Sequence, residues 1–256
     1  RVQADQNRIS RGDPHGGRLL KKKMHAVKSV GRRLESEEKR LTALPVFEDA
    51  IKLAFPPILQ PRGKEILRCS LPELSVAGRV LCRNVELVVH GGEHVGIFGK
   101  NGVGKTTLLA HIAEELLARS DVRTFYMPQN YAELLPRDCT SVGFLAPDGD
   151  KAAVTAARLL MGSAHFTREE MLAPICALSG GQRAKLCLLR PILSGADVLI
   201  LDEPTRNFSP LSNPVIRGIL RGYGGAILSV SHDRKYLLEV AETLYRQTPE
   251  GLRREW

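Results

Sequence analysis

The chain has 256 residues, of which 43% are hydrophobic and 25% are charged, and its formal net charge is +9. These proportions are ordinary for a globular protein, and the length suffices for one large α/β domain with an appendage. No apolar run reaches the roughly 20 residues of a membrane span, and the polar N-terminal segment does not resemble a secretory signal. The five cysteines show no paired spacing, which argues against a disulfide framework or zinc site and predicts a cytoplasmic protein.

The excess positive charge lies at the start of the chain. Residues 1–45 contain twelve Lys or Arg against five Asp or Glu, which accounts for seven of the nine net charges. Such a segment suits a phosphate backbone, although a charge run can also be a solvated helix face. Apolar residues follow heptad spacing from Leu20 to Leu41, so we predict a basic helical arm, half of a coiled coil, over residues 1–45. Its partner helix would come from upstream of Arg1 or from a second copy.

Prolines mark the passage from this arm to a domain. Pro56, Pro57 and Pro61 lie in residues 46–63, which we interpret as a Pro-rich connector. The domain that we expect over residues 64–256 opens with two strand-like runs, 65–69 and 79–89. They predict an antiparallel β flap ahead of the first strand of the main sheet.

A glycine-rich loop follows that strand, which we place at 94–98. Residues 99–106 match the phosphate-binding pattern G-x-x-x-x-G-K-[ST], and residues 107–117 have the apolar spacing of a helix. In this setting backbone N–H groups and the helix N-terminus bind phosphates. Lys105 can reach the β- and γ-phosphates, and the Thr106 hydroxyl can bind Mg²⁺. The predicted nucleotide-binding residues here are Gly99, Asn101, Gly102, Gly104, Lys105, Thr106 and Thr107.

The remaining segments continue an α/β pattern. A strand is expected at 122–127, just before Gln129, and residues 131–177 are expected to form a helical insertion with breaks at Pro136, 147–149 and 162–163. Ser179 is well placed to cap the next helix. The apolar strand 198–201 ends at two acidic residues, and open α/β sheets place their sites at such strand ends.

Two elements close the predicted domain. A helix should begin around residues 213–214, with a proline in its first turn. The last core strand is expected at 226–230, and His232 follows it.

Taken in order, these motifs resemble the nucleotide-binding domain of ATP-binding cassette (ABC) proteins over about residues 64–250. The family signature L-S-G-G-Q stands at 178–182, and Gln129 and His232 fit the glutamine loop and the switch histidine. The resemblance implies a P-loop NTPase fold of the α/β class, with a mostly parallel sheet, helices on both faces, the β flap and the helical insertion. It also implies that the chain is an ATPase.

The resemblance further implies a role for each group. Glu203 is the expected general base or water-orienting residue, with His232 and Gln129 beside it as the other catalytic residues. Thr106, Gln129 and Asp202 are the expected Mg²⁺ ligands. In this family the signature closes over the nucleotide of a facing domain, so hydrolysis needs a second cassette, from the same full-length chain or a second copy. The signature residues in question are Ser179, Gly180, Gly181 and Gln182.

Within the family the chain most resembles the ABC-F branch. Three segments carry this resemblance: the basic arm, residues 196–205 and residues 231–237. Because the chain begins with Arg1, it looks like the end of an interdomain linker followed by a second cassette. The branch implies a ribosome-bound factor whose linker contacts rRNA and tRNA, in translation or in protection against antibiotics. Two alternatives stay open. The ATPase subunit of a membrane transporter leaves the arm unexplained, and a DNA-repair or chromosome-type ATPase would carry its coiled coil inside the cassette.

The sequence departs from the branch at two places. Members usually read E-P-T-N-H-L-D, whereas residues 203–209 read E-P-T-R-N-F-S, so that Ser209 replaces an aspartate expected at the interdomain contact. Furthermore, no Phe, Tyr or Trp lies between Pro56 and Ile97 to stack on adenine. We therefore expect an apolar side chain such as Leu74 or Val76 to hold the base, with loose base selectivity.

Overall fold

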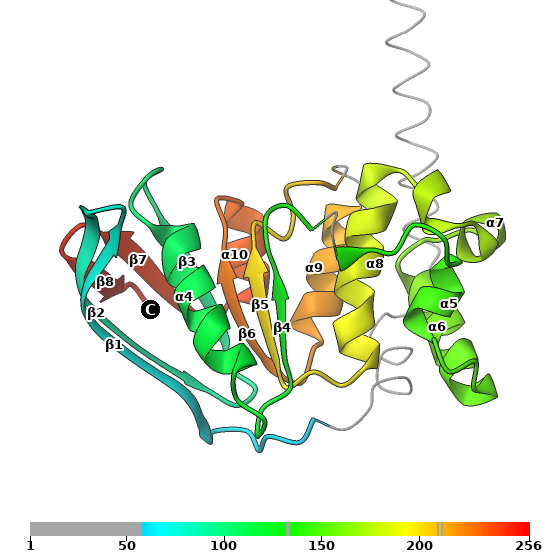
Figure 1. The fold of residues 1–256 in the computed structure, drawn as a ribbon, viewed down its shortest axis with the longest axis horizontal. Helices are drawn as coiled ribbons and strands as arrows, with labels where there is room; N and C mark the ends of the chain where they lie inside the picture. The colour runs from blue at the N-terminus through cyan, green and yellow to red at the C-terminus, as the bar shows by residue number, and fades with distance from the viewer. Residues whose placement is uncertain (1–57, 132–133, 209, 211) are drawn as a thin grey trace, which may run out of the picture. The chain divides into compact units, whose positions relative to one another are not determined.

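The computed structural model describes residues 58–131, 134–208, 210 and 212–256 (Figure 1). The predicted arm, the first part of the connector and Ser209 lie outside these residues. The strands are β1 (Glu65–Val76), β2 (Arg79–His90), β3 (His94–Gly99), β4 (Thr124–Met127), β5 (Val198–Asp202), β6 (Ala226–Val230), β7 (Thr243–Thr248) and β8 (Gly251–Arg254). The helices are α4 (Lys105–Leu117), α5 (Ser141–Leu145), α6 (Lys151–Ser163), α7 (Arg168–Leu172), α8 (Gly180–Leu193), α9 (Asn213–Arg221) and α10 (Arg234–Val240), with a 3₁₀ turn, η2, at Ile175–Ala177.

The main sheet has six strands in the order β4-β5-β6-β3-β7-β8. All neighbouring pairs are parallel except β7 and β8, which are antiparallel. Because parallel strands present their carboxyl ends at one edge, the segments that follow β3, β4, β5 and β6 meet there. The prediction of a mostly parallel α/β sheet is confirmed.

Alternation along the strands explains why helices cover both faces of the sheet. Val95 and Ile97 of β3 belong to the hydrophobic core that α4 joins through Leu109. Gly96 points to the other face, where an added Cβ atom would lie 2.9 Å from the Leu237 side chain of α10. Side chains of successive strand residues point to opposite faces, so β3 needs an apolar cover on each. Figure 1 shows α4 on one side of the sheet and α8 and α9 on the other.

The predicted flap is the two-stranded hairpin of β1 and β2. Ala77 and Gly78 form its turn, both with positive φ (49° and 78°), the backbone that two-residue hairpin turns require. The first strand is longer than the predicted run 65–69 and extends to Val76. Pairing with β2 holds this extension, so the tip of the flap carries Val76 and Arg79 directly opposite one another.

The predicted helical insertion lies between β4 and α8, and consists of α5, α6, α7 and η2. Pro147 to Gly149 separate α5 from α6, as predicted. At 162–163, where a break was expected, α6 continues through Ser163, and only Ala164 caps it. Buried Ala157, Leu160 and Met161 hold this last turn.

Residues 226–230, which the sequence analysis took as the last core strand, are followed by two more strands. The residues of β7 include Arg246 and Gln247, which give it a weak apolar pattern. Pairing with β3 makes this segment a strand, because Val95 to Gly99 bond it along their length. The helix α10, which was not predicted from the sequence, connects β6 to β7.

The end of the predicted connector is bonded to the sheet. The backbone N–H of Leu59 donates to Asp197 Oδ1 over 2.7 Å, and Asp197 also pairs with Arg123 at 3.2 Å. In the described part of the chain, no helix is both long enough and apolar enough to cross a membrane.

Candidate nucleotide-binding site

The glycine-rich loop joins the carboxyl end of β3 to the N-terminus of α4, as predicted. Lys105, the first residue of α4, is 7% exposed, and its ammonium donates to the carbonyl oxygens of Gly99 (3.0 Å) and Lys100 (2.9 Å). Burial lowers the pKa of Lys105, while Glu203 and Asp202 act in the opposite direction. The loop is therefore wrapped around a cation that faces two carboxylates.

Two glycines of this loop are required by their surroundings. Gly104 caps α4 in the left-handed region, with φ of 95°, and an added Cβ would lie 3.0 Å from Leu81. At Gly99 an added Cβ would lie 2.5 Å from the carbonyl oxygen of Gln247. The side chain of Gln247 also donates to Val103 O at 3.0 Å, so β7 braces the loop from the side.

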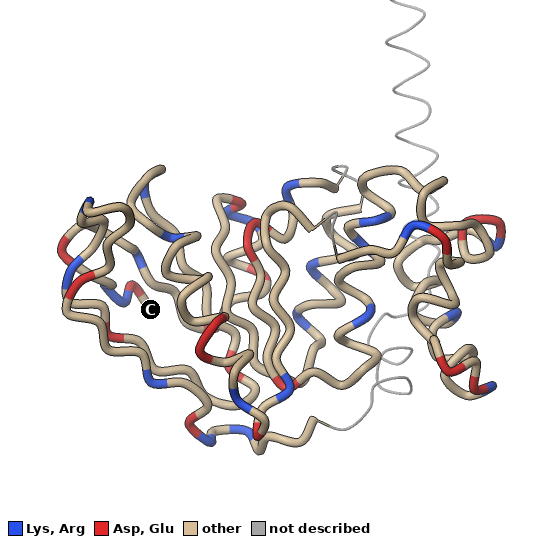
Figure 2. Tube along the Cα trace, viewed as in Figure 1, with Lys and Arg blue, Asp and Glu red and all other residues tan. Residues whose placement is uncertain are grey.

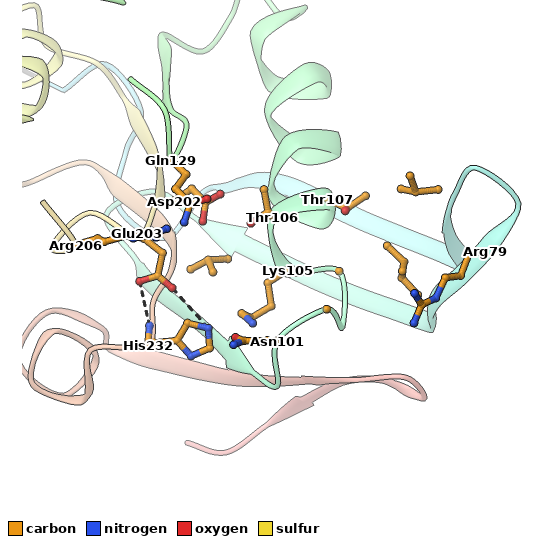
Figure 3. Close-up of a pocket in the computed structure, with 15 residues that line it drawn as sticks. Arg79, Asn101, Lys105, Thr106, Thr107, Gln129, Asp202, Glu203, Arg206 and His232 are labelled. Carbon is orange, nitrogen blue, oxygen red and sulfur yellow. Dashed lines mark hydrogen bonds and ion pairs between the residues drawn. The ribbon is translucent and has the colours of Figure 1, made fainter. Parts of the chain in front are cut away.

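The loop opens on a cavity of about 820 Å³ at the carboxyl edge of the sheet (Figure 3). Four parallel strands deliver residues to it: β3 the loop, β4 Gln129, β5 Asp202 and Glu203, and β6 His232. Ten predicted site residues line this cavity: Asn101, Gly102, Gly104, Lys105, Thr106, Thr107, Gln129, Asp202, Glu203 and His232. Gly99 lines a neighbouring cavity on the β7 side of the loop.

Glu203 and His232 face each other across the ends of β5 and β6. The His232 backbone N–H donates to Glu203 Oε2 at 3.3 Å, and the His232 ring Nε2 lies 3.7 Å from Oε1. Glu203 has a φ of +51°, a conformation that non-glycine residues adopt only at a cost of about 1–3 kcal/mol. Its N–H donates to Val230 O at 2.9 Å, which holds the residue in this strained position. The fold thus fixes a carboxylate whose side chain is 14% exposed at the cavity wall.

Asp202 is suited to a divalent cation. The residue is 2% exposed, and neither carboxylate oxygen has a hydrogen-bond partner among the described residues. Burial raises the pKa of Asp202, although Thr106 and Lys105 lie near enough to oppose the shift. An ionised carboxylate buried without a partner is costly, and a cation relieves that cost. The described residues contain no cluster of three or more His, Cys, Asp or Glu, so Mg²⁺ would take further ligands from Thr106, from the nucleotide or from water.

The signature residues Ser179 to Gln182 do not line this cavity. Ser179 Oγ accepts from the Gln182 N–H at 3.3 Å, and Gln182 Oε1 accepts from the Ser179 N–H at 2.7 Å. This reciprocal capping box starts α8 and confirms the predicted cap. The Gln182 side chain also donates to Glu170 near the start of α7. Gly180 is exposed at the tip, with nothing within 4 Å of an added Cβ.

Sequence reasoning missed two arginines, Arg79 and Arg206, that line the cavity. Arg79 stands opposite Val76 at the tip of the flap, and Val76 lines the cavity while Leu74 is buried beneath the loop. Of the two side chains expected to hold the base, Val76 is therefore the one in position. Arg206 follows Glu203 by three residues, and a turn joins the two. That short spacing from a predicted catalytic residue was the signal that could have placed Arg206 at the cavity.

The residues that form this site lie in a region of the chain that is similar to known proteins. A family model described as ABC transporter matches residues 82–206. Ribosome protection protein VmlR of Bacillus subtilis is 33% identical over 217 residues, which cover 82% of this chain and 39% of that protein. ABC transporter F family member 5 of Arabidopsis thaliana is 26% identical over 212 residues, which cover 80% of this chain and 30% of that protein. Elongation factor 3 of Zygosaccharomyces rouxii is 30% identical over 202 residues, which cover 76% of this chain and 18% of that protein.

The chain spans about a third of the length of the first curated relatives that it matches. Among solved structures, a dimeric ATP-binding cassette in a post-hydrolysis state with ADP and Pi has a TM-score of 0.60 at 18% identity, over 73% of this chain and 95% of that one. That likeness supports the fold. The ordered motifs, the strand-end cavity and these relatives together identify the chain as an ABC-F ATP-binding cassette, a member of the ABC family.

Proposed function

We propose that this cassette binds ATP with Mg²⁺ in the strand-end cavity and hydrolyses it to ADP and phosphate. The observation that carries the proposal is the meeting of three groups from separate segments. These are the buried cation Lys105, the partnerless buried carboxylate Asp202, and the Glu203–His232 pair. A triphosphate needs positive charge and N–H donors, and the loop offers both.

Each side chain then has a defined task. Lys105 binds the β- and γ-phosphates, and Glu203 orients a water molecule and takes its proton as the water oxygen bonds to the γ-phosphorus. The bond from that phosphorus to the bridging oxygen breaks, and ADP leaves with the electron pair. His232 hydrogen-bonds the γ-phosphate and holds Glu203 in place. Mg²⁺, held by Thr106 and Asp202 with Gln129 nearby, would neutralise charge on the phosphates.

A second cassette completes the site in this proposal. The signature tip at Gly180 lies outside the cavity and is exposed, so its N–H groups are available to a nucleotide on a facing domain. That domain is another cassette of the same full-length protein, or a second copy of this chain. A solved relative of the fold is dimeric, which supports the arrangement.

We further propose that the whole protein acts on the ribosome in the cytoplasm, as a translation factor or in protection against antibiotics. The names of two relatives, a ribosome protection protein and an elongation factor, support this class of partner. The basic segment 1–45 would bind rRNA and tRNA phosphates, because its charge is one-sided. Its structure lies outside the described residues.

The experiment that tests the ribosome role uses the protein containing this chain with Glu203→Gln, which should bind ATP without turnover. It is sedimented with ribosomes with and without ATP, and Lys105→Ala serves as the control that binds no nucleotide. We expect ATP-dependent co-sedimentation of the Glu203 variant alone. If none occurs at moderate salt while ATP binding by fluorescence is intact, the ribosome role is wrong and the ATPase assignment stands. Binding to membranes that contain a partner permease would favour the transporter alternative.

A further inference from the structure

Arg206, like Arg79, is a cation of the cavity that neither the motifs nor the family pattern assigns. It lines the same cavity as Lys105, Glu203 and His232. Figure 3 shows it beside Glu203, on the opposite side of the cavity from Arg79. The branch pattern E-P-T-N-H-L-D has a neutral Asn at this place, so Arg206 is a positive charge that the pattern lacks.

The backbone at Arg206 is fixed by a turn. Its N–H donates to Glu203 O at 3.1 Å, and Thr205, one residue before it, is 5% exposed. The start of the turn is bonded in turn to β6 through the Glu203 N–H. Arg206 and Glu203 are therefore held at one side of the cavity by the same anchored loop.

The guanidinium of Arg206 has no ion pair or side-chain hydrogen bond within the described ranges. Several other arginines of the domain are paired, among them Arg123 with Asp197, Arg217 with Glu239 and Arg246 with Glu255. Arg206 nevertheless lies within electrostatic reach of the metal-binding carboxylate. Its charge lowers the pKa of Asp202, against the larger effect of burial. It is thus an uncommitted cation beside the position where the γ-phosphate would lie.

We propose that Arg206 binds the terminal phosphoryl oxygens of ATP from the side opposite the loop and stabilises the charge that develops on them during hydrolysis. A planar guanidinium suits this task because it donates two parallel hydrogen bonds to phosphate oxygens. In other NTPases an arginine at the terminal phosphate is worth about 10³–10⁵ in turnover. The inference rests on the proposed ATPase function and adds a residue that distinguishes ATP from ADP.

The test compares the affinities of ATP and ADP, since only ATP carries the terminal phosphate. Fluorescent analogues of both are titrated with Mg²⁺ and with EDTA into Glu203→Gln chains with and without Arg206→Ala. We expect ATP to bind about 10- to 100-fold more weakly to the Arg206 variant, as for a lost charge-assisted hydrogen bond, with ADP within about twofold. Arg221→Ala, which removes an exposed arginine at the end of α9 away from the cavity, should change neither.

Arg206→Lys refines the result and guards against a folding artefact. Lysine keeps the positive charge but lacks the two parallel N–H donors of the guanidinium. This variant should therefore recover part of the ATP affinity, while its turnover, measured with Glu203 intact, stays low. Equal loss of ATP and ADP affinity, or no loss of either, overturns the inference. If Arg206→Ala is misfolded by its melting temperature, a Lys variant with unchanged affinity and turnover overturns it instead. Failure of the unmodified chain to bind any nucleotide would instead overturn the proposed function.

Discussion

The phosphate-binding loop and the signature are equally recognisable in the sequence, but they occupy different surroundings. The loop lies at the centre of the sheet edge, where four strand ends surround it with side chains of both charges. Its key groups are unsatisfied or strained: within the described ranges neither carboxylate oxygen of Asp202 accepts a hydrogen bond, and Glu203 has a positive φ. A ligand would relieve these costs.

The signature lies at the start of α8, and its polar side chains are satisfied. Ser179 and Gln182 cap each other, and Glu170 accepts from Gln182. At the exposed tip, the Tyr131 hydroxyl donates to the Gly180 carbonyl oxygen at 3.0 Å, while the space around an added Gly180 Cβ atom is open. Figure 2 shows acidic and basic residues interspersed over the domain. The loop is therefore arranged to bind a ligand within its own domain, whereas the signature presents its backbone to a ligand outside that domain.

The largest effect is expected for Lys105→Ala, which tests whether the loop binds the phosphates. It removes the buried cation that the loop surrounds, so we expect ATP binding to fall by at least 100-fold, as expected for the loss of several charge-assisted contacts, roughly 1.5–3 kcal/mol each. Isothermal titration would measure the loss, and Lys235→Ala, an exposed lysine outside the cavity, is the matched control. Retained affinity in the Lys105 variant would mean that the loop does not hold the phosphates.

Glu203→Gln separates binding from chemistry at the same site. The amide keeps the size of the side chain but cannot accept the proton of water, so turnover should drop by about 10²- to 10⁴-fold while ATP affinity is retained. Single-turnover hydrolysis with radiolabelled ATP measures this, with the exposed Glu114→Gln of α4 as control. Unchanged hydrolysis would remove Glu203 from its assigned role.

Gly180→Asp probes the signature side of the comparison. An added Cβ atom meets nothing within 4 Å, and an acid in the first turn suits the helix dipole, so the fold should be intact. The new charge should repel the nucleotide of a facing cassette and weaken ATP-dependent association of Glu203→Gln chains about tenfold, as for one unfavourable charge contact. Analytical ultracentrifugation measures association. Ala152→Asp in the first turn of α6 is the control. Weaker ATP binding by the single chain would contradict the proposal that the signature acts on a facing domain.

The smallest expected effect is on the free energy of unfolding. It distinguishes the two aspartates at the ends of β5, Asp197 and Asp202. Asp197 is fully buried, and although burial acts to raise its pKa, hydrogen bonds from Arg123 and Leu59 hold that pKa below its ordinary value. Neither carboxylate oxygen of Asp202 has a hydrogen-bond partner at ordinary distance among the described residues, and burial raises its pKa although Thr106, Lys105 and Arg206 act to lower it. Without ligand, Asp197→Asn should therefore lower the unfolding free energy by about 1–3 kcal/mol at neutral pH, and Asp202→Asn should raise it by about 1–2 kcal/mol.

Thermal unfolding between pH 4 and 8 checks both signs. The ionised carboxylate of Asp202 costs no stability below its unfolded pKa and its full cost above its raised folded pKa. The gain from Asp202→Asn should therefore shrink as pH drops below the folded pKa and vanish below the unfolded pKa. The contribution of Asp197 is present above its unfolded pKa and is lost as pH falls through its lowered folded pKa, so the Asp197→Asn loss should persist further into acid. A Mg²⁺ titration of ATP binding accompanies these scans, and Asp202→Asn should weaken it. Equal effects of the two changes would refute the contrast.

Much of the site could be predicted because its signals are local. The phosphate loop needs only a strand, glycines and a helix in succession, and the cap at Ser179 needs only Gln182 three residues later. The missed β7 and β8 show the limit of such signals. Arg246 and Gln247 interrupt the apolar pattern of β7, and the pairing that makes it a strand involves β3, about 150 residues earlier in the chain.

The sequence by itself determined which chemical groups this protein carries and the local structures that present them, because a loop, a cap or an apolar strand depends on neighbours a few residues away. Only the tertiary structure decided which of those groups meet. The parallel order of β3, β6, β5 and β4 places Lys105, His232, Glu203 and Gln129 at one edge, although they are up to about 130 residues apart in the chain. The same packing brings Arg206 into the cavity and leaves Gly180 out of it. Strand order is set by long-range hydrogen bonding and burial, which no local pattern of residues specifies.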